Sequence, residues 1–590
     1  MVEKFYQLSK KEIIFLVVVI FLYGILGYWN LGSCSAPETY YKIESETDSA
    51  EFKVNEQPTS ILLYAPVNDS TKYIGLKISC SSDGINWTSA FDTRTDDKDY
   101  TAAMIWYNYP LETNIDTHYI KIEKLETANR LVLSEVAFKN AADTIIEAEP
   151  LNEGSTLLMD EPETIQLKSD RLNSAYFDES YFPSSALEMQ DGLNVAEMDH
   201  PPVGRLIIGL GMTIFGRNPF GFRSIQVFFG IMMLPLLYFF SKALFKSSKW
   251  AGFTMLILAL DFMHYTQTRI GTLDAFLVFF ILGMYSFLYF YHINTHQRAR
   301  YVLLLISGIF TGLAIGTKWS GCYAALGLAI LYFYWTICGF VKGDISIKKM
   351  YIKETLWCCL CFLVFPIIIY AISYIPYALT IPDQSFFKTF IEHQQQMLGY
   401  HTGDSTHYHH PYSSKWWTWI VALKPVFYYY QAQPVTIYLY GTGNPLIWGI
   451  GFLGVIFAGI MTFLKKSDSG MVIVIGYFSQ LIPWLFITRD TFLYHYFPMV
   501  PFLILGLSYL LKNIGNTPKY YQIKQGYALL FLIVAFVCFI MAFPFIYGSP
   551  MEWSTVLWLR QFFLIIMGIM FFILLIIGVL DLISEHSSKL

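Results

Sequence analysis

The sequence predicts a polytopic α-helical membrane protein with a soluble β-rich domain inside its first loop. Of its 590 residues, 54% are hydrophobic and only 14% are charged, and the mean hydropathy is +0.42. This composition is typical of multi-spanning membrane proteins. The net charge of −5 gives no indication of a nucleic-acid-binding surface, so we expect no nucleic-acid partner. A long polar segment, rich in Thr, Ser, Asp and Glu, separates the first apolar run from the remaining ones.

About twelve apolar runs have roughly the length of twenty residues that a helix needs to cross a bilayer. They cover residues 13–29, 222–240, 251–265, 273–291, 301–315, 322–340, 356–378, 446–464, 471–487, 492–511, 526–546 and 557–582. The first run is not followed by a convincing small-x-small cleavage site, so we interpret it as an uncleaved span rather than a signal peptide.

The basic residues predict the orientation of the spans. Lys and Arg are concentrated in alternate loops, which fall on the same side as the Lys-rich N-terminus. By the positive-inside rule, that side is cytoplasmic. The opposite face receives Asp178-Glu179, Lys318, the 381–415 loop and Arg489, and we expect the active site there. We therefore expect a multi-pass protein of the cell membrane, with its active site on the extracytoplasmic face.

Residues 31–150 are predicted to form an extracytoplasmic all-β sandwich. Residues 60–64, 73–78, 118–122 and 131–138 alternate in polarity as strands do, and no helix of convincing length interrupts them. Cys34 and Cys80 are the cysteines of this loop and could pair, but the sequence does not decide this. The six other cysteines lie in apolar runs and are interpreted as packing residues.

Residues 80–88 contain a strand, an Asp-Gly turn and Trp87. Together with residues 119–123 and 133–138, they resemble the discoidin-like (coagulation-factor C-type) β-sandwich over roughly residues 37–147. Members of that group often bind carbohydrate or lipid headgroups, so the resemblance implies a carbohydrate partner for this domain. The favoured alternative is that Trp87 is an ordinary core residue.

Two adjacent carboxylates, Asp178 and Glu179, lie close to the apolar region. Acidic groups beside a membrane are costly unless they have a role or a partner. One such carboxylate could act as a general base toward a hydroxyl. A solvated pair or a helix-start pair is the alternative for these two residues. Further along, two prolines and a glycine in the 200–205 segment fix the chain between His200 and Arg205.

Several cations near span ends could hold a lipid-linked phosphate. Arg205, Arg269 and Lys318 are the main candidates, because Arg and Lys form charge-assisted hydrogen bonds with phosphate oxygens. Interfacial snorkelling is the alternative for any one of them. Arg489 is a weaker candidate, because the neighbouring Asp490 could be its partner.

A metal site is not expected. His401, His407, His409 and His410 with Asp404 invite a metal interpretation, but nothing completes a recognisable ligand pattern. We favour a polar outer loop, and we expect no metal and no cofactor.

Several motifs, taken together, resemble the protein O-mannosyltransferase family, with the bacterial branch most similar. They are residues 176–179, 200–205, Arg269 with Leu273-Asp274, 316–321, 373–377, 410–419, 443–448 and 496–498. The resemblance covers roughly residues 170–510, and its specificity comes from the order and number of the motifs. It implies a C-type glycosyltransferase fold and a polyprenyl-phosphate sugar donor, whose anomeric centre is inverted without a nucleotide sugar.

The resemblance also assigns roles to residues. It implies that Asp178 is the base that deprotonates the acceptor hydroxyl, and that Glu179 positions the acceptor or shapes the local field. Arg269 is the first choice for the donor phosphate, followed by Lys318 and Arg205. Three further residues, His200, Asp274 and Arg489, would support the site.

The expected organisation has five parts along the chain. Residues 1–30 form the first span, 31–150 the sandwich and 151–202 a catalytic first-loop segment. Residues 203–440 form the membrane core with its outer loop, and 441–590 the C-terminal transmembrane helices.

The chain departs from the family at some positions. The family often has Leu and Lys where this chain has Val203 and Arg205, and an Arg changes the contact geometry. The 381–415 loop is too short for the trefoil domain of eukaryotic members, which favours a bacterial cell membrane.

The expected function is transfer of a sugar, with mannose favoured, from the lipid-linked donor to Ser/Thr hydroxyls of proteins. One alternative is the same donor chemistry on a glycan or lipid acceptor. A transporter is an alternative from another class, for which we would expect inverted repeats and polar residues in mid-membrane. The sequence shows neither feature.

Overall fold

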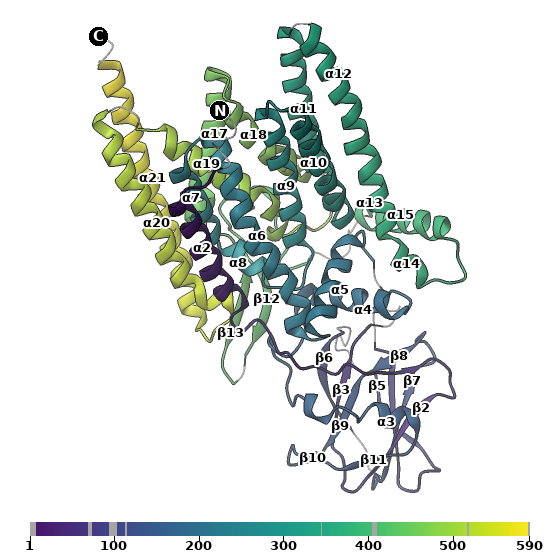
Figure 1. Cartoon of the computed structure of the whole chain (residues 1–590). Coiled ribbons are helices and arrows are strands. Elements are labelled where there is room, and N and C mark those ends of the chain that lie inside the picture. The colour runs from purple at the N-terminus through teal and green to yellow at the C-terminus, as the bar shows by residue number, and fades with distance from the viewer. Residues whose placement is uncertain are drawn as a thin grey trace. The chain divides into compact units, whose positions relative to one another are not determined.

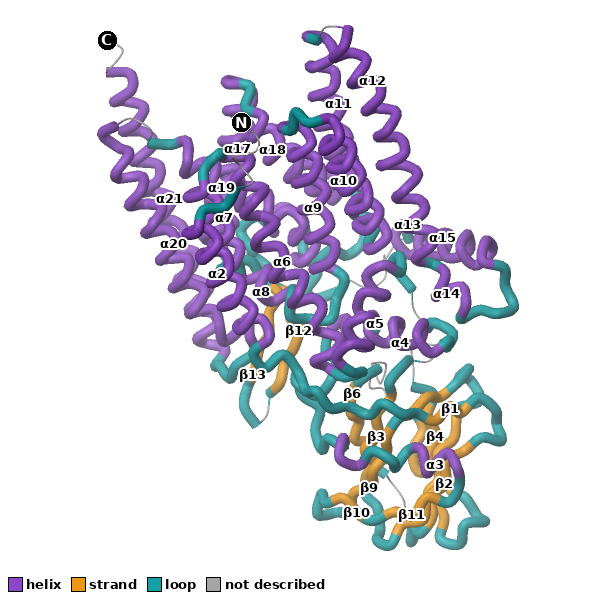
Figure 2. The backbone as a smooth tube through the Cα atoms, in the orientation of Figure 1, coloured by secondary structure: helices purple, strands orange, loops and turns teal. Residues whose placement is uncertain are grey.

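The computed structural model describes residues 7–68, 74–93, 103–111, 115–196, 198–343, 345–403, 410–432, 434–515 and 518–587. The chain forms two compact units. The helical unit comprises Met1–Gly27, Gln226–Ser373 and Gln396–Leu590, and the sandwich unit comprises Tyr28–Ile225 and Tyr374–Gln395. Figures 1 and 2 show the elements of both units.

Ten helical stretches of the described residues are long and apolar enough to cross a membrane. They are α2 (Lys10–Tyr28), α6 (Pro219–Phe245), α9 (Asp274–Ile293), α10 (Gln297–Thr317), α11 (Gly321–Lys342), the stretch Ile345–Leu379 that contains α12 (Ile345–Cys359), α13 (Phe365–Ser373) and α14 (Ile375–Leu379), α17 (Pro445–Lys465), the stretch Leu493–Asn513 that ends in α19 (Val500–Asn513), α20 (Pro518–Tyr547) and α21 (Trp553–Ser587). The predicted multi-pass architecture is confirmed.

Two of the twelve predicted spans form shorter helices instead. The 251–265 run divides into α7 (Ser248–Ala259) and α8 (Phe262–Gln267), because the Asp261 carboxylate caps α8 by accepting a 3.0 Å hydrogen bond from the His264 backbone N–H. The 471–487 run gives α18 (Asp468–Leu481), which ends before Pro483. Hydropathy is averaged over a window, so it does not detect breaks of this kind.

Small residues let helices of the helical unit approach closely. A Cβ atom added to Gly454 of α17 would lie 2.3 Å from the carbonyl oxygen of Gly506 in α19. Close approach through glycine is a common way of packing membrane helices, since lipid provides little hydrophobic drive for association. Figure 1 also shows α20 and α21 side by side.

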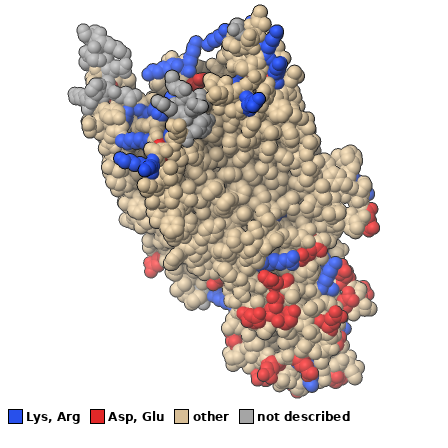
Figure 3. Space-filling view, in the orientation of Figure 1, with Lys and Arg blue, Asp and Glu red and all other residues tan. Residues whose placement is uncertain are grey.

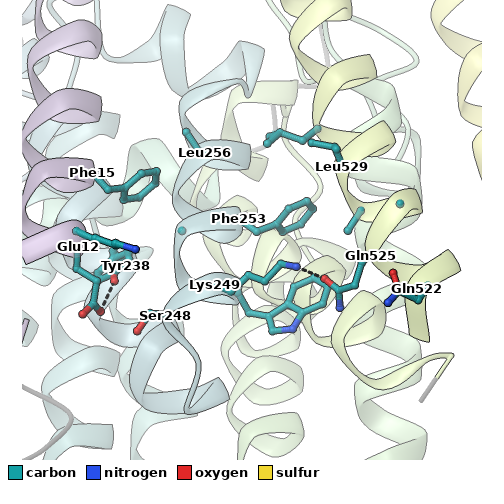
Figure 4. Close-up of a pocket in the computed structure, with 16 residues that line it drawn as sticks. Glu12, Phe15, Tyr238, Ser248, Lys249, Phe253, Leu256, Gln522, Gln525 and Leu529 are labelled. Atoms are coloured by element: carbon teal, nitrogen blue, oxygen red, sulfur yellow. Dashed lines mark hydrogen bonds between the residues drawn. The ribbon is translucent and has the colours of Figure 1, made fainter. Parts of the chain in front are cut away.

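One end of the helical unit is basic, as the loop charges predicted (Figure 3). There, Glu12 of α2 accepts hydrogen bonds from Lys242 and from the Tyr238 hydroxyl of α6, at 2.5 and 2.8 Å. A cavity of about 730 Å³ lies beside this pair. Figure 4 shows its polar side at Lys249 and its apolar side at Phe253. None of the candidate site residues lines this cavity.

The sandwich unit contains the predicted β-sandwich. Its four-stranded sheet has the order β10-β9-β3-β6, its five-stranded sheet has the order β11-β2-β7-β4-β5, and β1 pairs with β8. The strands are β1 (Tyr41–Ile43), β2 (Ser49–Val54), β3 (Ser60–Ala65), β4 (Leu76–Ser81), β5 (Thr88–Asp92), β6 (Ile105–Pro110), β7 (Tyr119–Lys124), β8 (Leu131–Leu133), β9 (Glu135–Lys139), β10 (Ile145–Ile146) and β11 (Ala148–Pro150). All the pairings are antiparallel.

The predicted strands are confirmed as β3, β4, β7, β8 and β9, although β4 begins only at Leu76 and residue 73 lies outside the described residues. The Asp-Gly turn joins β4 to β5. Trp87 is half-buried at the end of this turn, with the Lys121 ammonium 5.7 Å from its ring centroid. The core interpretation of Trp87 was therefore wrong. The resemblance to discoidin-like domains stays a prediction.

Cys34 and Cys80 do not form a disulfide in this structure. Cys34 is exposed, whereas Cys80 is fully buried in the sandwich core. Beyond the sandwich, the polar segment contains a helix of ten residues, α4 (Phe182–Asp191), which the sequence did not predict. Pro183 in its first turn and the left-handed Gly192 at its end define its limits. α4 contacts α5 (Val203–Phe215), a shorter apolar helix.

The buried core of the sandwich gives a prediction for its stability. Phe52 of β2 is fully buried and contacts Phe138 of β9 edge to face, with ring centroids 5.1 Å apart. Phe52→Ala should lower the free energy of unfolding by about 3–5 kcal/mol, because it removes apolar contacts and leaves a cavity. Ile85→Ala is the control, since Ile85 is 79% exposed. Thermal unfolding of the purified full chain measures both, and an equal loss in the two variants would contradict the assigned core.

Candidate active site

Asp178 and Glu179 lie in a tight turn, the 3₁₀ helix η2 (Phe177–Ser180) of the sandwich unit. Phe177 adopts a positive φ of 55°, a left-handed conformation that is uncommon for a bulky residue. Such strain persists only where surrounding structure enforces it, and it is frequent at functional sites. Asp178 is half-buried, whereas Glu179 is fully buried. The two carboxylates therefore have different environments.

Arg223, near the start of α6, binds Glu179. Its Nε donates to Glu179 Oε1 at 2.7 Å, and its Nη2 donates to Glu179 Oε2 at 2.6 Å. Its other N–H groups donate to the backbone carbonyls of Leu31, Arg171 and Ser174, at 3.1, 2.8 and 2.9 Å. All five N–H donors of a guanidinium are thereby used. Sequence reasoning missed Arg223, although a lone Arg at the start of an apolar run is a signal of function.

Glu179 also holds the turn itself. Its Oε2 accepts a 3.1 Å hydrogen bond from the Tyr176 backbone N–H, which closes the turn around Asp178. With both oxygens engaged and no exposed surface, Glu179 is placed to shape the turn and its field. Of the two roles implied for Glu179, these contacts favour shaping of the local field over direct positioning of the acceptor.

The sandwich is connected to this turn by hydrogen bonds. The Asn68 side chain donates to the Ser180 carbonyl at 3.3 Å, and Arg130 donates to the Asn68 carbonyl at 3.2 Å. Arg130 also forms an ion pair with Glu188 of α4, at 2.5 Å. The turn around Asp178 and the sandwich are therefore parts of one polar network.

Arg205 is fully buried and bonded inside the protein. Its guanidinium donates to the Ser185 hydroxyl, the His200 carbonyl and the Asp199 carboxylate, each at 2.8 Å. His200 Nε2 lies 3.6 Å from the same carboxylate. These contacts favour a structural role for Arg205 and His200, in which they hold the Pro-Pro segment onto α4.

His393 of α15 (Phe386–Thr402) also belongs to the sandwich unit. One ring nitrogen lies 2.6 Å from the Met198 carbonyl, and the other lies 3.1 Å from the Tyr374 hydroxyl. Burial lowers the pKa of His393 to about 4. The ring is therefore neutral at physiological pH and serves as a connector between the 198–205 segment and α15.

In the helical unit, Lys318 and Asp274 form a buried ion pair. Lys318 Nζ lies 2.8 Å from Asp274 Oδ1, and Gln267 donates to Asp274 Oδ2 at 3.1 Å. The Tyr428 hydroxyl donates to the Gln267 carbonyl oxygen, and the Lys318 ammonium lies 5.9 Å from the Tyr494 ring. Lys318, predicted for the donor phosphate, and Asp274, predicted as a supporting residue, are thus brought together, and the carboxylate balances the charge of the cation.

Arg269 lies between α8 and α9 and is 8% exposed. Its Nη1 donates to the carbonyls of Leu26, at 3.1 Å, and of Gly27, near the end of α2. Its guanidinium also lies over two aromatic rings, 5.2 Å from that of Tyr265 and 5.3 Å from that of Tyr547. These contacts with neutral groups orient the guanidinium.

Arg489 is half-buried, and its Nη1 makes a long 3.4 Å contact with the Asp490 carbonyl. The Asp490 carboxylate accepts a 2.6 Å hydrogen bond from the His410 backbone N–H. Within the described residues, no carboxylate forms an ion pair with Arg489. Arg489 therefore stays a candidate for the donor phosphate, and its sequence neighbour Asp490 is not its ion-pair partner.

The histidine-rich loop is only partly described. His407, His409 and Asp404 lie outside the described residues, so the expectation that this loop holds no metal stays a prediction. His410 Nδ1 accepts a 3.2 Å hydrogen bond from the Tyr412 backbone N–H.

Two family models match this chain. Residues 175–380 match the model of dolichyl-phosphate-mannose-protein mannosyltransferases. Residues 386–564 match the model of the C-terminal four-transmembrane region of protein O-mannosyltransferases. Together these matches cover more than half of the chain, and they include Asp178, Arg269, Lys318 and Arg489.

Curated proteins and a solved structure agree with these matches. The polyprenol-phosphate-mannose–protein mannosyltransferase of Mycobacterium tuberculosis is 23% identical over 65% of this chain and 85% of its own length. Its Corynebacterium glutamicum counterpart is 26% identical over 52% of this chain and 69% of its own length. The Saccharomyces cerevisiae Pmt1-Pmt2 complex shares the fold, with a TM-score of 0.57 and 14% identity over 65% of this chain and 88% of that one. The chain belongs to the protein O-mannosyltransferase family.

Proposed function

We propose that this protein is an inverting glycosyltransferase that moves mannose from a polyprenyl-phosphate donor to Ser/Thr hydroxyls of proteins. The relatives that carry this activity in their names match the chain over most of their own length. The observation that carries the proposal is the turn around Asp178, in which Glu179 is locked by Arg223 and Asp178 remains half-buried. A fold likeness alone would not assign a reaction.

In the proposed reaction, Asp178 accepts the proton of the acceptor hydroxyl while the hydroxyl oxygen attacks C1 of the sugar. The C1–O bond to the phosphate breaks, and the polyprenyl phosphate leaves with the bonding electron pair. Attack from the side opposite to the phosphate inverts the anomeric centre. A positioned general base contributes roughly 10²–10⁴-fold to the rate of such a step.

The donor phosphate would be bound by cations of the helical unit. Arg269 is oriented by neutral carbonyls, and Arg489 makes no ion pair with a carboxylate of the described residues, so both can offer charge-assisted hydrogen bonds. Lys318 would contribute with Asp274 as its counter-charge. We do not include Arg205, because its buried contacts occupy it.

We propose that the reaction takes place on the extracytoplasmic face. The basic end of the helical unit, with Lys242 and Lys249, corresponds to the cytoplasmic side by the positive-inside rule. A glycan or lipid hydroxyl is the second candidate acceptor. A carbohydrate ligand of the sandwich is supported by half-buried Trp87, whose ring remains partly accessible for stacking.

Asp178→Asn should reduce the rate of transfer roughly 10²–10⁴-fold, because an amide cannot accept the acceptor proton. The assay follows labelled polyprenyl-phosphate mannose and a Ser/Thr-rich peptide, with the purified full chain. Asp116→Asn is the matched control, since the Asp116 side chain is 81% exposed. Full transfer by Asp178→Asn would refute the assignment of the base. Donor consumption without glycopeptide would indicate the second candidate acceptor.

Glu179→Gln should lower the free energy of unfolding by about 3–5 kcal/mol, because it leaves the buried Arg223 guanidinium without its counter-charge. Activity should fall with it, since the turn around Asp178 loses its clamp. Thermal unfolding and initial rates measure the two effects. The control is Asp191→Asn, which breaks the more exposed pair with Arg217 and should cost less than Glu179→Gln. Equal effects of the two variants would contradict the role of the buried pair.

Arg489→Ala should raise the KM for the donor roughly tenfold to a hundredfold, in line with the loss of about 1.5–3 kcal/mol of a charged hydrogen bond. The KM for the peptide should stay unchanged. Lys465→Ala, at the exposed end of α17, serves as a control for the loss of one surface charge. An unchanged donor KM in Arg489→Ala would remove this residue from the phosphate site.

A further inference from the structure

A second group of carboxylates lies in the sandwich unit, apart from the turn around Asp178. It consists of Glu135 at the start of β9, with Asp160 and Glu161 in the segment that follows α3 (Glu153–Leu157). One carboxylate oxygen from each residue lies within 4.8 Å of the others. Glu135 is fully buried, Glu161 is half-buried and Asp160 is exposed. The group therefore reaches from the protein interior to the surface.

Hydrogen bonds position these carboxylates. Glu161 Oε2 accepts from the backbone N–H groups of Glu38 and Thr39, both at 2.9 Å. The Thr39 hydroxyl lies 2.8 Å from Glu161 Oε2 and 2.9 Å from Asp160 Oδ1. Glu135 Oε2 accepts from the Glu161 backbone N–H at 3.2 Å. Two segments, at residue 135 and at residues 160–161, thus hold their acidic side chains in one place, and the 38–39 segment donates hydrogen bonds to them.

The other oxygen of Glu135 is a separate observation that points to a ligand. Glu135 Oε1 is buried, and it has no hydrogen-bond partner among the described residues. A buried carboxylate oxygen without a partner is costly, and two neighbouring carboxylates increase the cost by repulsion. Either a proton or a cation must compensate. Without a cation, burial and the nearby acidic groups raise the pKa of Glu135 to about 8, which keeps the carboxyl protonated.

We propose that Glu135, Asp160 and Glu161 bind a calcium ion, with the Thr39 hydroxyl beside it. The donor set consists of hard oxygen atoms, which Ca²⁺ prefers, and it lacks the nitrogen and sulfur ligands typical of zinc. Ca²⁺ tolerates irregular spacing and mixed mono- and bidentate carboxylates, whereas Mg²⁺ requires near-octahedral geometry. Figure 3 shows that acidic side chains are abundant on the visible surface of this unit, which would favour the approach of cations.

The ion would act as a clamp between three parts of the chain. It would join β9 to the 38–39 segment that enters the sandwich and to the 160–161 segment that leads toward the turn of Asp178. The proposal does not depend on the proposed transfer reaction, because it concerns the stability of the sandwich unit.

The test is thermal unfolding of the purified full chain after removal of metals with EDTA, followed by titration with CaCl₂. We expect saturating Ca²⁺ to raise the unfolding midpoint by several degrees, because the ion binds the folded state only. Calorimetric titration of the same protein should give a binding stoichiometry of about one ion per chain at these three ligands. A wild-type protein whose midpoint does not respond to Ca²⁺ would overturn the proposal, and so would an equal shift with Mg²⁺ at the same concentration.

Variants distinguish this site from general cation effects. Asp160→Asn changes an exposed residue, so it should fold normally and lose most of the Ca²⁺-dependent shift. Glu135→Gln should also lose the shift, but it should be as stable as the wild type in EDTA, because an amide of the same size replaces the buried carboxyl. Glu163→Gln is the matched control, since Glu163 is an exposed neighbour outside the ligand set. A full shift in Asp160→Asn would refute the site.

Discussion

The buried ion pair between Arg223 and Glu179 is the interaction on which the candidate site depends. Arg223 joins the turn of Asp178 to three backbone carbonyls from the 31 and 171–174 segments. Desolvating two charges is expensive, so a pair of this kind contributes little net stability but strongly favours one arrangement over others. The pair holds a strained turn in which Phe177 has a positive φ. In this turn the Glu179 carboxylate is buried and Asp178 is half-buried.

The cations that the sequence singled out differ in what surrounds them. Arg205 is enclosed by protein acceptors and holds the Pro-Pro segment, whereas Lys318 is balanced by Asp274. Arg269 contacts neutral carbonyls, and Arg489 makes a long contact with one carbonyl of the described residues. Because a guanidinium can serve either as an internal connector or as an anion site, its partners and burial decide between the two roles.

The sandwich is more than an appended domain, because it shares a polar network with the turn. Asn68 contacts Ser180, and Arg130 contacts both Asn68 and Glu188 of α4. The proposed calcium clamp would add a second connection, through the 160–161 segment. Conditions that loosen the sandwich should therefore also affect the turn that presents Asp178, since the two lie in one compact unit.

Local properties of the sequence determined the fold class, ten of the twelve predicted spans and five of the strands. They also singled out the adjacent carboxylates Asp178 and Glu179. Hydropathy over twenty residues and alternation over six are visible in any window of the chain, so these features need no knowledge of distant contacts. Only the tertiary structure decided that Arg223 is the partner of Glu179, that Asp261 interrupts a predicted span and that Trp87 is outside the core. Ion pairs, helix caps within apolar runs and the burial of a side chain depend on which distant segments pack against one another. Local patterns in a single sequence do not specify these tertiary contacts.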